Sequence, residues 1–226
     1  MGALIRILVL LTLTISSLAF MIYYVTDFIV SIGSIKRIIK RDFKKLEQMI
    51  KVYTDGLIPW DVEELKLLSG KPISKIKRRS NYSTSKGYLS TIYQEPIFAF
   101  GIRKYHKSGR MIMLAKSESE NFKFHFDNDH TKVYRGDQYL GYITADDRYM
   151  ANKSEITARI ENENALKYAA IYAGDTDIAH LNLNDPDGKP ISERAFSVFH
   201  GFDEENADSL VILSLYHILF KPNLNL

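Results

Sequence analysis

The hydrophobic pattern of this chain begins with a run of twenty uncharged residues, Ile7–Thr26. A helix rises about 1.5 Å per residue, so a helix of this length spans roughly 30 Å, the thickness of the hydrocarbon core of a bilayer. Tyr23 and Tyr24 lie near the end of the run, where amphipathic rings favour the membrane interface. The pattern therefore predicts a transmembrane helix, and we expect residues 1–34 to form a membrane anchor.

A cleaved signal peptide is the alternative for this segment. Arg6 would supply its positive flank, and Ser17-Leu18-Ala19 has the small-x-small form of a cleavage site. The apolar run continues through Phe20–Val25, beyond the point of cleavage, so we expect a retained anchor. The lysines and arginines that follow the run place the large domain in the cytoplasm by the positive-inside rule. The chain is therefore predicted to be a single-pass membrane protein.

The next segment, residues 35–52, has apolar positions spaced by three and four, which predicts an amphipathic helix. These positions are Ile35, Ile38, Ile39, Phe43, Leu46, Met49 and Ile50. The polar face is basic, and two interpretations stay open: a helix that lies along lipid headgroups, or a solvated helix that joins anchor and domain. Further on, Asp61-Val62-Glu63-Glu64 has the form of a capping box and predicts a short helix. Residues 35–72 are thus expected to form a basic helix and a connector.

From residue 73 the period changes to the alternation that is typical of strands. Phe122, Phe124 and Phe126 alternate with polar residues, which places three rings on one face. Further strand-like segments are Tyr88–Tyr93, Ile97–Arg103, Arg110–Ala115, Lys132–Tyr134, Tyr139–Ile143, Ile156–Glu161, Leu166–Tyr172, Ile178–Leu183 and Ala195–Phe199. Many short strands without alternating long helices predict an antiparallel sandwich or a closed barrel.

The C-terminal stretch Ala207–Phe220 is apolar on almost every side, and a helix of this kind is buried. We expect it at the centre of the domain formed by residues 73–226. The predicted fold class is mainly β (α+β). It consists of an N-terminal transmembrane helix and a closed antiparallel β-barrel of about 10–12 strands around a buried hydrophobic C-terminal helix.

Two phrases and the order of elements carry a resemblance to a known family. The phrases are VYRGDQYLGYI over Val133–Ile143 and YAGDTDIAHL over Tyr172–Leu181. Together with the C-terminal helix, they make residues 73–221 resemble the tubby-like and phospholipid-scramblase-like barrel that LURP-one-related proteins share. The resemblance implies a closed barrel that is usually non-enzymatic and often acts at membranes. The chain lacks a cysteine cluster for acylation, and no phosphoinositide-binding or calcium-binding residue matches by position, so no site residue is carried over.

Charge divides the chain into a basic and an acidic part. Residues 1–110 carry 19 Lys and Arg against 8 Asp and Glu, a net charge of +11, and residues 111–226 carry a net charge of −8. Anionic lipid headgroups attract nearby basic side chains by about 1 kcal/mol each. We expect the following residues at a membrane surface: Lys36, Arg37, Lys40, Arg41, Lys44, Lys45, Lys75, Lys77, Arg78 and Arg79. Arg103, Lys104, Lys107 and Arg110 add to the basic excess of the domain.

Catalytic chemistry has little support in the sequence. The chain has no cysteine, which excludes disulfides, thiol catalysis and cysteine-based zinc sites. The group HFDNDH over His125–His130 has ligand-type side chains, but a polar strand end followed by a turn is the simpler interpretation. Asp185-Pro186-Asp187-Gly188 fails as a calcium loop, because Leu183 and Arg194 would occupy positions that require Asp and Glu. We predict no catalytic, cofactor-binding or metal-binding residue, no cofactor, and a satisfied core histidine at His217.

The leading hypothesis is a membrane-anchored, non-enzymatic module that binds anionic lipid headgroups or a membrane protein through a basic face. Nucleic acid is not an expected partner, because no nucleic-acid motif accompanies the basic residues. An alternative is a membrane-bound enzyme or envelope-assembly factor with a polar site around His125–His130 or Asp175–Asp187. A third is a protein-interaction scaffold that uses an open sheet edge. The sequence does not indicate an oligomeric state.

Overall fold

The computed structural model describes residues 14, 16–18, 20–22, 25, 36–127, 129–151, 156–161, 168–182, 193–199 and 204–224. The chain divides into two compact units, Met1–Lys44 and Lys45–Leu226. Residues 36–50 are helical, and a 3-10 turn, η1 (Lys51–Tyr53), follows. The short helix α2 (Val62–Lys66) begins where the capping box predicts, because the Asp61 side chain accepts hydrogen bonds from the backbone N–H groups of Glu63 and Glu64.

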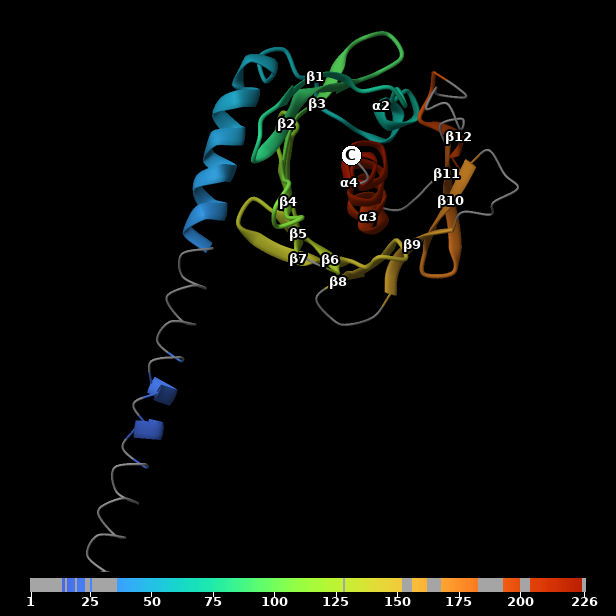
Figure 1. The fold of residues 1–226 in the computed structure, drawn as a ribbon. Helices are drawn as coiled ribbons and strands as arrows, with labels where there is room; N and C mark the ends of the chain where they lie inside the picture. Colours follow the sequence, from blue (N-terminus) through green and yellow to red (C-terminus); the bar gives the residue numbers. More distant parts are fainter. Residues whose placement is uncertain are drawn as a thin grey trace, which may run out of the picture. The chain divides into compact units, whose positions relative to one another are not determined.

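A single antiparallel sheet of 12 strands makes up most of the second unit (Figure 1). The spatial order of the strands follows the chain from β1 to β12, each paired with its neighbours in sequence. The strands are β1 (Ile73–Arg78), β2 (Tyr82–Ser90), β3 (Pro96–Tyr105), β4 (Met111–Lys116), β5 (Asn121–Asp127), β6 (His130–Arg135), β7 (Gln138–Ile143), β8 (Arg148–Ala151), β9 (Ile156–Glu161), β10 (Tyr168–Ala173), β11 (Thr176–Asn182) and β12 (Phe196–Phe199). Short hairpin turns account for most connections in this meander.

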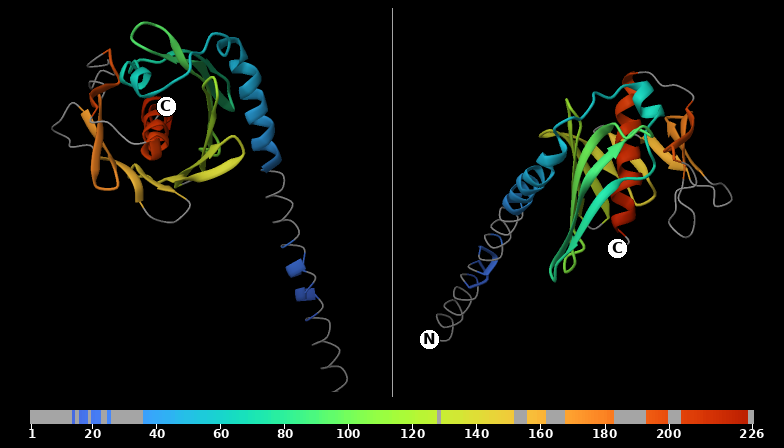
Figure 2. Two further views of the ribbon diagram at one scale, coloured as in Figure 1. Left: turned by 180° about the vertical axis from the view of Figure 1, so that it is seen from behind. Right: turned by 90° about the horizontal axis from the view of Figure 1, so that it is seen from above.

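The sheet curves around the C-terminal helix, which lies on its concave side (Figures 1 and 2). Register shifts interrupt five of the ladders that the structure describes, for example between Val133 and Tyr134, and such bulges bend a sheet and increase its twist. The helix consists of α3 (Glu204–Leu215), a π-helical turn η2 (Tyr216–Phe220) and α4 (Lys221–Leu224). Because the sheet is curved, it covers this apolar helix on several sides.

The hydrophobic core lies between the helix and the concave face of the sheet. Phe122 and Phe124 are fully buried on that face, and Phe126 packs against the same core, as their alternation predicts. The rings of Phe124 and Phe220 lie 6.0 Å apart, which links β5 to η2. Helix residues on all sides are buried: Leu210, Val211, Ile212, Leu213, Leu215, Leu219 and Phe220. Burial of each such side chain contributes about 1.5–3 kcal/mol, so the helix stabilises the sheet that surrounds it.

The sheet is not closed into a barrel, and the prediction of a closed barrel is wrong. In the described part of the chain, β1 and β12 end the strand order and no ladder joins them. Among the described residues, the segment Leu68–Gly70 contacts both ends of the sheet. It forms single bridges, Leu68 with Thr91 and Ser69 with Arg194, and the Gly70 N–H donates to the Glu193 carbonyl over 3.1 Å. Closure needs a continuous ladder between strands about 4.8 Å apart, and every residue of β1 is instead exposed to solvent.

The prediction of a transmembrane helix is also wrong. Among the residues that the structure describes, no helix combines the length and the apolar character needed to cross a membrane. This finding contradicts the anchor over residues 1–34 and, with it, the single-pass, cytoplasmic localisation that we inferred from the flanking charges. Most of the run Ile7–Thr26 lies outside the described residues.

Two ion pairs attach the C-terminal helix to the sheet, one near each end. Arg135 at the end of β6 pairs with Asp208 in α3 and with Glu120, the latter over 3.5 Å. Lys221 in α4 pairs with Asp147, which lies in the β7–β8 turn and is buried. The two pairs fix the helix along its axis, while the apolar core fixes it laterally.

Candidate functional site: a basic groove on β1, β2 and β3

Strand register gathers basic side chains on the convex face of the first three strands. Lys77 pairs with Thr84, and Thr84 pairs in turn with Arg103, so the three residues form one row across β1, β2 and β3. Lys75 and Lys86 form the neighbouring row. Alternate residues of a strand point to the same face, so these side chains lie opposite the face that covers the core. Strand pairing therefore brings residues that are separate in the sequence together on one surface.

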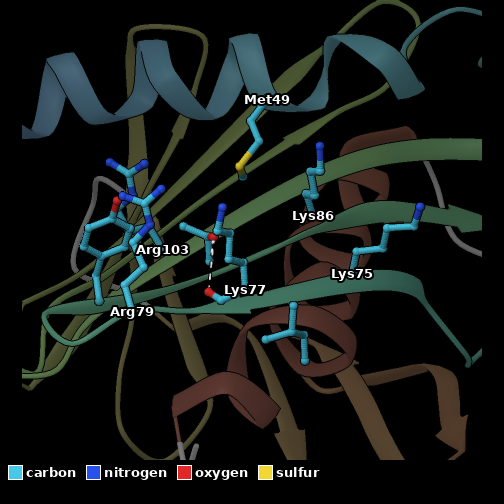
Figure 3. A pocket seen from close by; sticks show the side chains of 9 residues that line it. Met49, Lys75, Lys77, Arg79, Lys86 and Arg103 are labelled. Carbon is cyan, nitrogen blue, oxygen red and sulfur yellow. Dashed lines mark hydrogen bonds between the residues drawn. The ribbon is translucent and has the colours of Figure 1, made fainter.

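These residues line a groove of about 450 Å³. Its lining is Met49, Lys75, Ile76, Lys77, Arg79, Tyr82, Thr84, Lys86 and Arg103. Five of these nine side chains are cationic, and none is acidic. Figure 3 shows Arg79 beside Arg103 at one end of the groove, Lys75 and Lys86 at the other, and Lys77 between them. Like charges focused in a concave surface raise the local concentration of anions.

Gly101 allows the wall of the groove to form. This residue continues the row of Lys75 and Lys86 onto β3, and a Cβ atom placed on it would lie 2.9 Å from Ile50 Cγ2. Leu46 and Ile50 are fully buried, so the end of the preceding helical segment rests on β3 at this point. Met49 from the same turn borders the groove (Figure 3). A side chain at position 101 would push this wall away.

Aromatic rings orient the basic groups at both ends of the groove. The guanidinium groups of Arg103 and Arg79 lie 5.0 Å and 5.6 Å from the centre of the Tyr82 ring. Arg103 is only 9% exposed. At the other end, Lys86 Nζ lies 5.8 Å from the centre of the Tyr53 ring. Such contacts contribute about 0.5–2 kcal/mol and limit the conformations of the side chains, which favours binding of a ligand in a defined position.

A hydroxyl group fixes the backbone between these two ends. The Thr84 hydroxyl donates to the Lys77 carbonyl over 3.4 Å (Figure 3). The contact joins β1 and β2 within the row that carries Lys77. Because β1 has a ladder on one side only, this link helps to hold its basic residues against the groove.

The structure brings together only some of the predicted basic residues. Lys75, Lys77 and Arg79 line the groove, whereas Arg78 belongs to the opposite face of β1 by alternation. Lys36, Arg37, Lys40, Arg41 and Lys44 belong to the first unit, and Lys45 is not among the residues that line the groove. The basic residues of the groove therefore come from β1, β2, β3 and Arg79, which follows β1.

Lys86 and Arg103 are the site residues that the sequence prediction missed. We expected a strand to begin at Tyr88, but β2 begins at Tyr82, so Lys86 was not assigned to a face. Arg103 was recognised as basic without being placed in a site. The alternation Tyr82, Thr84, Lys86 is the signal that would have extended the predicted strand back to Tyr82, with its polar groups on the groove side.

Within the described residues, the candidate groups of the acidic part lie in separate hairpins. His125 lies on β5, where burial lowers the pKa of its imidazole. Asp127 and His130 belong to the β5–β6 hairpin, whereas Asp175 and Asp177 belong to the β10–β11 hairpin, five strands further along the sheet. The segment Asp185–Gly188 lies outside the described residues. Within the described ranges, no cluster of three His, Asp or Glu residues has the geometry to hold a metal ion.

Fold and groove together define an antiparallel β protein with a helix on its concave side and a cationic site on its convex side. Comparison of the chain with protein-family models, with curated proteins and with solved structures finds no match. The resemblance to the tubby-like and scramblase-like barrels stays a prediction.

Proposed function

We propose that this protein is a non-enzymatic binding module whose basic groove holds the anionic headgroups of membrane lipids. One observation carries the proposal: five cations line one groove and no carboxylate is among the residues that line it. Cationic side chains in a concave surface attract anions, and a phosphate or carboxylate ligand complements their charge. An anion is therefore the ligand that this site favours.

The volume and the types of side chain fit a headgroup. Ligand sites usually measure about 300–1,000 Å³, and the groove measures about 450 Å³. Arg79 supplies a planar group that binds phosphate or carboxylate through two hydrogen bonds. Lys75, Lys77 and Lys86 supply compact charges on flexible chains. A binding role is favoured over a catalytic one because the lining contains no histidine or carboxylate to move a proton.

A lipid headgroup fits the groove better than nucleic acid does. Binding of single strands relies on aromatic faces on which bases stack. Two guanidinium groups lie against the Tyr82 ring of the groove, which leaves that ring unsuited to stacking. Attraction to an anionic lipid surface requires only the charges themselves, at about 1 kcal/mol for each basic side chain.

Partition of the full chain between buffer and vesicles tests this proposal. We expect binding to phosphatidylcholine vesicles that contain phosphatidylserine to exceed binding to phosphatidylcholine alone, and the excess to fall between about 0.1 M and about 1 M salt, because screening shortens from about 10 Å to about 3 Å. The double variant Lys77→Gln/Arg79→Gln removes two of the five charges. At about 1 kcal/mol each, the excess should fall about thirtyfold.

A second double variant, Lys123→Gln/Arg148→Gln, is the matched control. It removes the same total charge, but from residues that pair with Asp137 and Asp146 outside the groove. The control should bind anionic vesicles like the unmodified chain. Equal binding to both kinds of vesicle, or an equal loss in the two double variants, would refute a specific role of the groove.

A further inference from the structure

Apolar side chains at the margin of the groove indicate how the protein meets a lipid surface. In the described part of the unit Lys45–Leu226, five large hydrophobic side chains are exposed: Val52, Ile73, Ile76, Tyr93 and Val198. Ile73 is 47% exposed and Ile76 is 54% exposed, and both belong to β1. Val52 is 68% exposed. Isolated exposed hydrophobic residues are common, but Ile73 and Ile76 both lie on the edge strand that carries the groove cations Lys75 and Lys77.

Sequence adjacency and strand pairing place the three residues in one region of the sheet. Val52 precedes Tyr53, whose ring lies 5.9 Å from that of Tyr88. Tyr88 is the cross-strand partner of Ile73. Ile76 follows three residues later on the same strand and lines the groove itself. Aliphatic and aromatic groups thus lie directly beside Lys75, Lys77 and Lys86, the combination that is typical of surfaces that bind at a membrane interface.

We infer that the protein docks on anionic lipid with the outer edge of β1 inserted into the interfacial layer. Ile73 and Ile76 enter the boundary between headgroups and acyl chains, and the groove cations hold the headgroups. This inference rests on the proposed function. Apolar residues project from both faces of β1, since Ile73 and Ile76 differ by an odd number of positions, which suits a strand that enters edge-on. Lysine stems bury their methylene groups and keep the ammonium groups among headgroups.

The hydrogen-bond pattern of β1 limits the depth of insertion. The Arg79 N–H donates to the Tyr82 carbonyl over 2.9 Å, so Arg79 faces β2. Antiparallel strands alternate between residues that face the partner and residues that face away. With the regular register of β1 and β2, the backbone groups of Ser74, Ile76 and Arg78 therefore face away from the ladder. Such groups lose too much solvation in hydrocarbon, which restricts the edge to the hydrated interface, about 5–10 Å deep.

Charge complementarity selects lipid over the alternative occupants of this edge. A second copy of the chain paired along β1 would place lysines and arginines opposite like charges, which destabilises a sheet. A neutral lipid surface would leave the cations without partners. An anionic bilayer satisfies both the cations and the isoleucines. An acidic extended segment of another protein is the competing occupant that the experiment must distinguish.

The chain contains no cysteine, so single-cysteine labelling tests the inference directly. Ile73→Cys, Ile76→Cys and, as control, Val198→Cys on β12 are each labelled with an environment-sensitive nitrobenzoxadiazole group in the full chain. All three positions are exposed, so folding should not change, which circular dichroism checks. On phosphatidylserine-containing vesicles, we expect a blue shift with increased intensity at positions 73 and 76 and no shift at 198. Inorganic phosphate without vesicles should shift none of them.

Substitution of the isoleucine adds a quantitative measurement. Ile76→Ser should weaken binding to anionic vesicles about tenfold at about 1 M salt, where the charges contribute least, whereas Ile76→Leu should bind normally. Vesicle binding without a blue shift at 73 and 76 would overturn insertion and leave the proposed function intact. If the groove variant Lys77→Gln/Arg79→Gln binds like the unmodified chain, the proposed function itself fails. A blue shift with a polyglutamate peptide but not with vesicles would assign the edge to a protein partner instead.

Discussion

His217 shows how the interior of the fold controls a single group. Burial, followed by the nearby positive charge of Lys221, lowers the pKa of its imidazole to about 4. In the described residues, no hydrogen-bond partner lies within reach of its Nε2 atom. His217 is half-buried, and its Nε2 atom lacks the partner that the prediction of a satisfied core histidine implies. The side chain stays neutral at the cost of an unsatisfied nitrogen.

This environment predicts that acid destabilises the protein through His217. The unfolded chain takes up a proton near the ordinary pKa of 6.5, whereas the folded chain does so only near 4. Stability should therefore fall as the pH decreases from about 6.5 to about 4, by about 3 kcal/mol in total. Urea unfolding at several pH values measures the effect. His217→Leu should lose most of this pH dependence, and His106→Asn, at an exposed position, should keep it. The same slope in the two variants would contradict the assignment.

At the scale of elements, apolar alternation locates strands only where one face is apolar. Phe122, Phe124 and Phe126 predict β5 because large rings alternate with polar residues. The first half of β2 has no such contrast, since Thr84 and Ser85 are both polar and both buried. Lys86 follows directly, so its face could not be assigned. Because these buried residues are polar, the sequence did not predict the part of the candidate site on β2. The basic residues of β1 were predicted from the high Lys and Arg content of that segment.

The two ion pairs of the C-terminal helix should differ in their contribution to stability. Asp147 is buried, so Lys221→Met leaves a carboxylate without its counter-ion, at a cost of about 3 kcal/mol. Asp208 is 44% exposed in its side chain, and Asp208→Asn should cost only about 1 kcal/mol because water solvates the Arg135 group that remains. Chemical denaturation at neutral pH measures both. An equal or larger loss in Asp208→Asn would show that burial does not rank the two pairs.

At the scale of the whole molecule, the sequence predicts strands and a buried helix but not how the sheet ends. The apolar pattern of Ala207–Phe220 indicates burial on all sides, and α3 is buried in that manner. Closure of a sheet depends instead on where its first and last strands meet. Here that depends on Leu68–Gly70, a segment of irregular backbone that contacts residues more than a hundred positions away. Local periodicity contains no information about such a contact.

The open edge of β1 predicts a pattern of amide exchange. Backbone N–H groups of Lys75 and Lys77 face β2 and should exchange slowly, whereas those of Ser74, Ile76 and Arg78 should exchange rapidly. Hydrogen exchange followed by NMR, with the protein free of lipid, distinguishes the two sets. Uniform protection along β1 would indicate a partner strand on its outer edge and therefore a closed sheet.

The π-helical turn η2 sets the rotational phase of the C-terminal helix. A π-turn accommodates one more residue than an α-turn does, and each residue of an α-helix rotates the direction of a side chain by about 100°. If Tyr216–Phe220 formed an ordinary α-helical turn with the same number of residues, Lys221 would be rotated by about that angle, away from Asp147. The extra residue thus acts as a phase shift: it allows one helix to direct its first half toward Arg135 and its last turn toward Asp147.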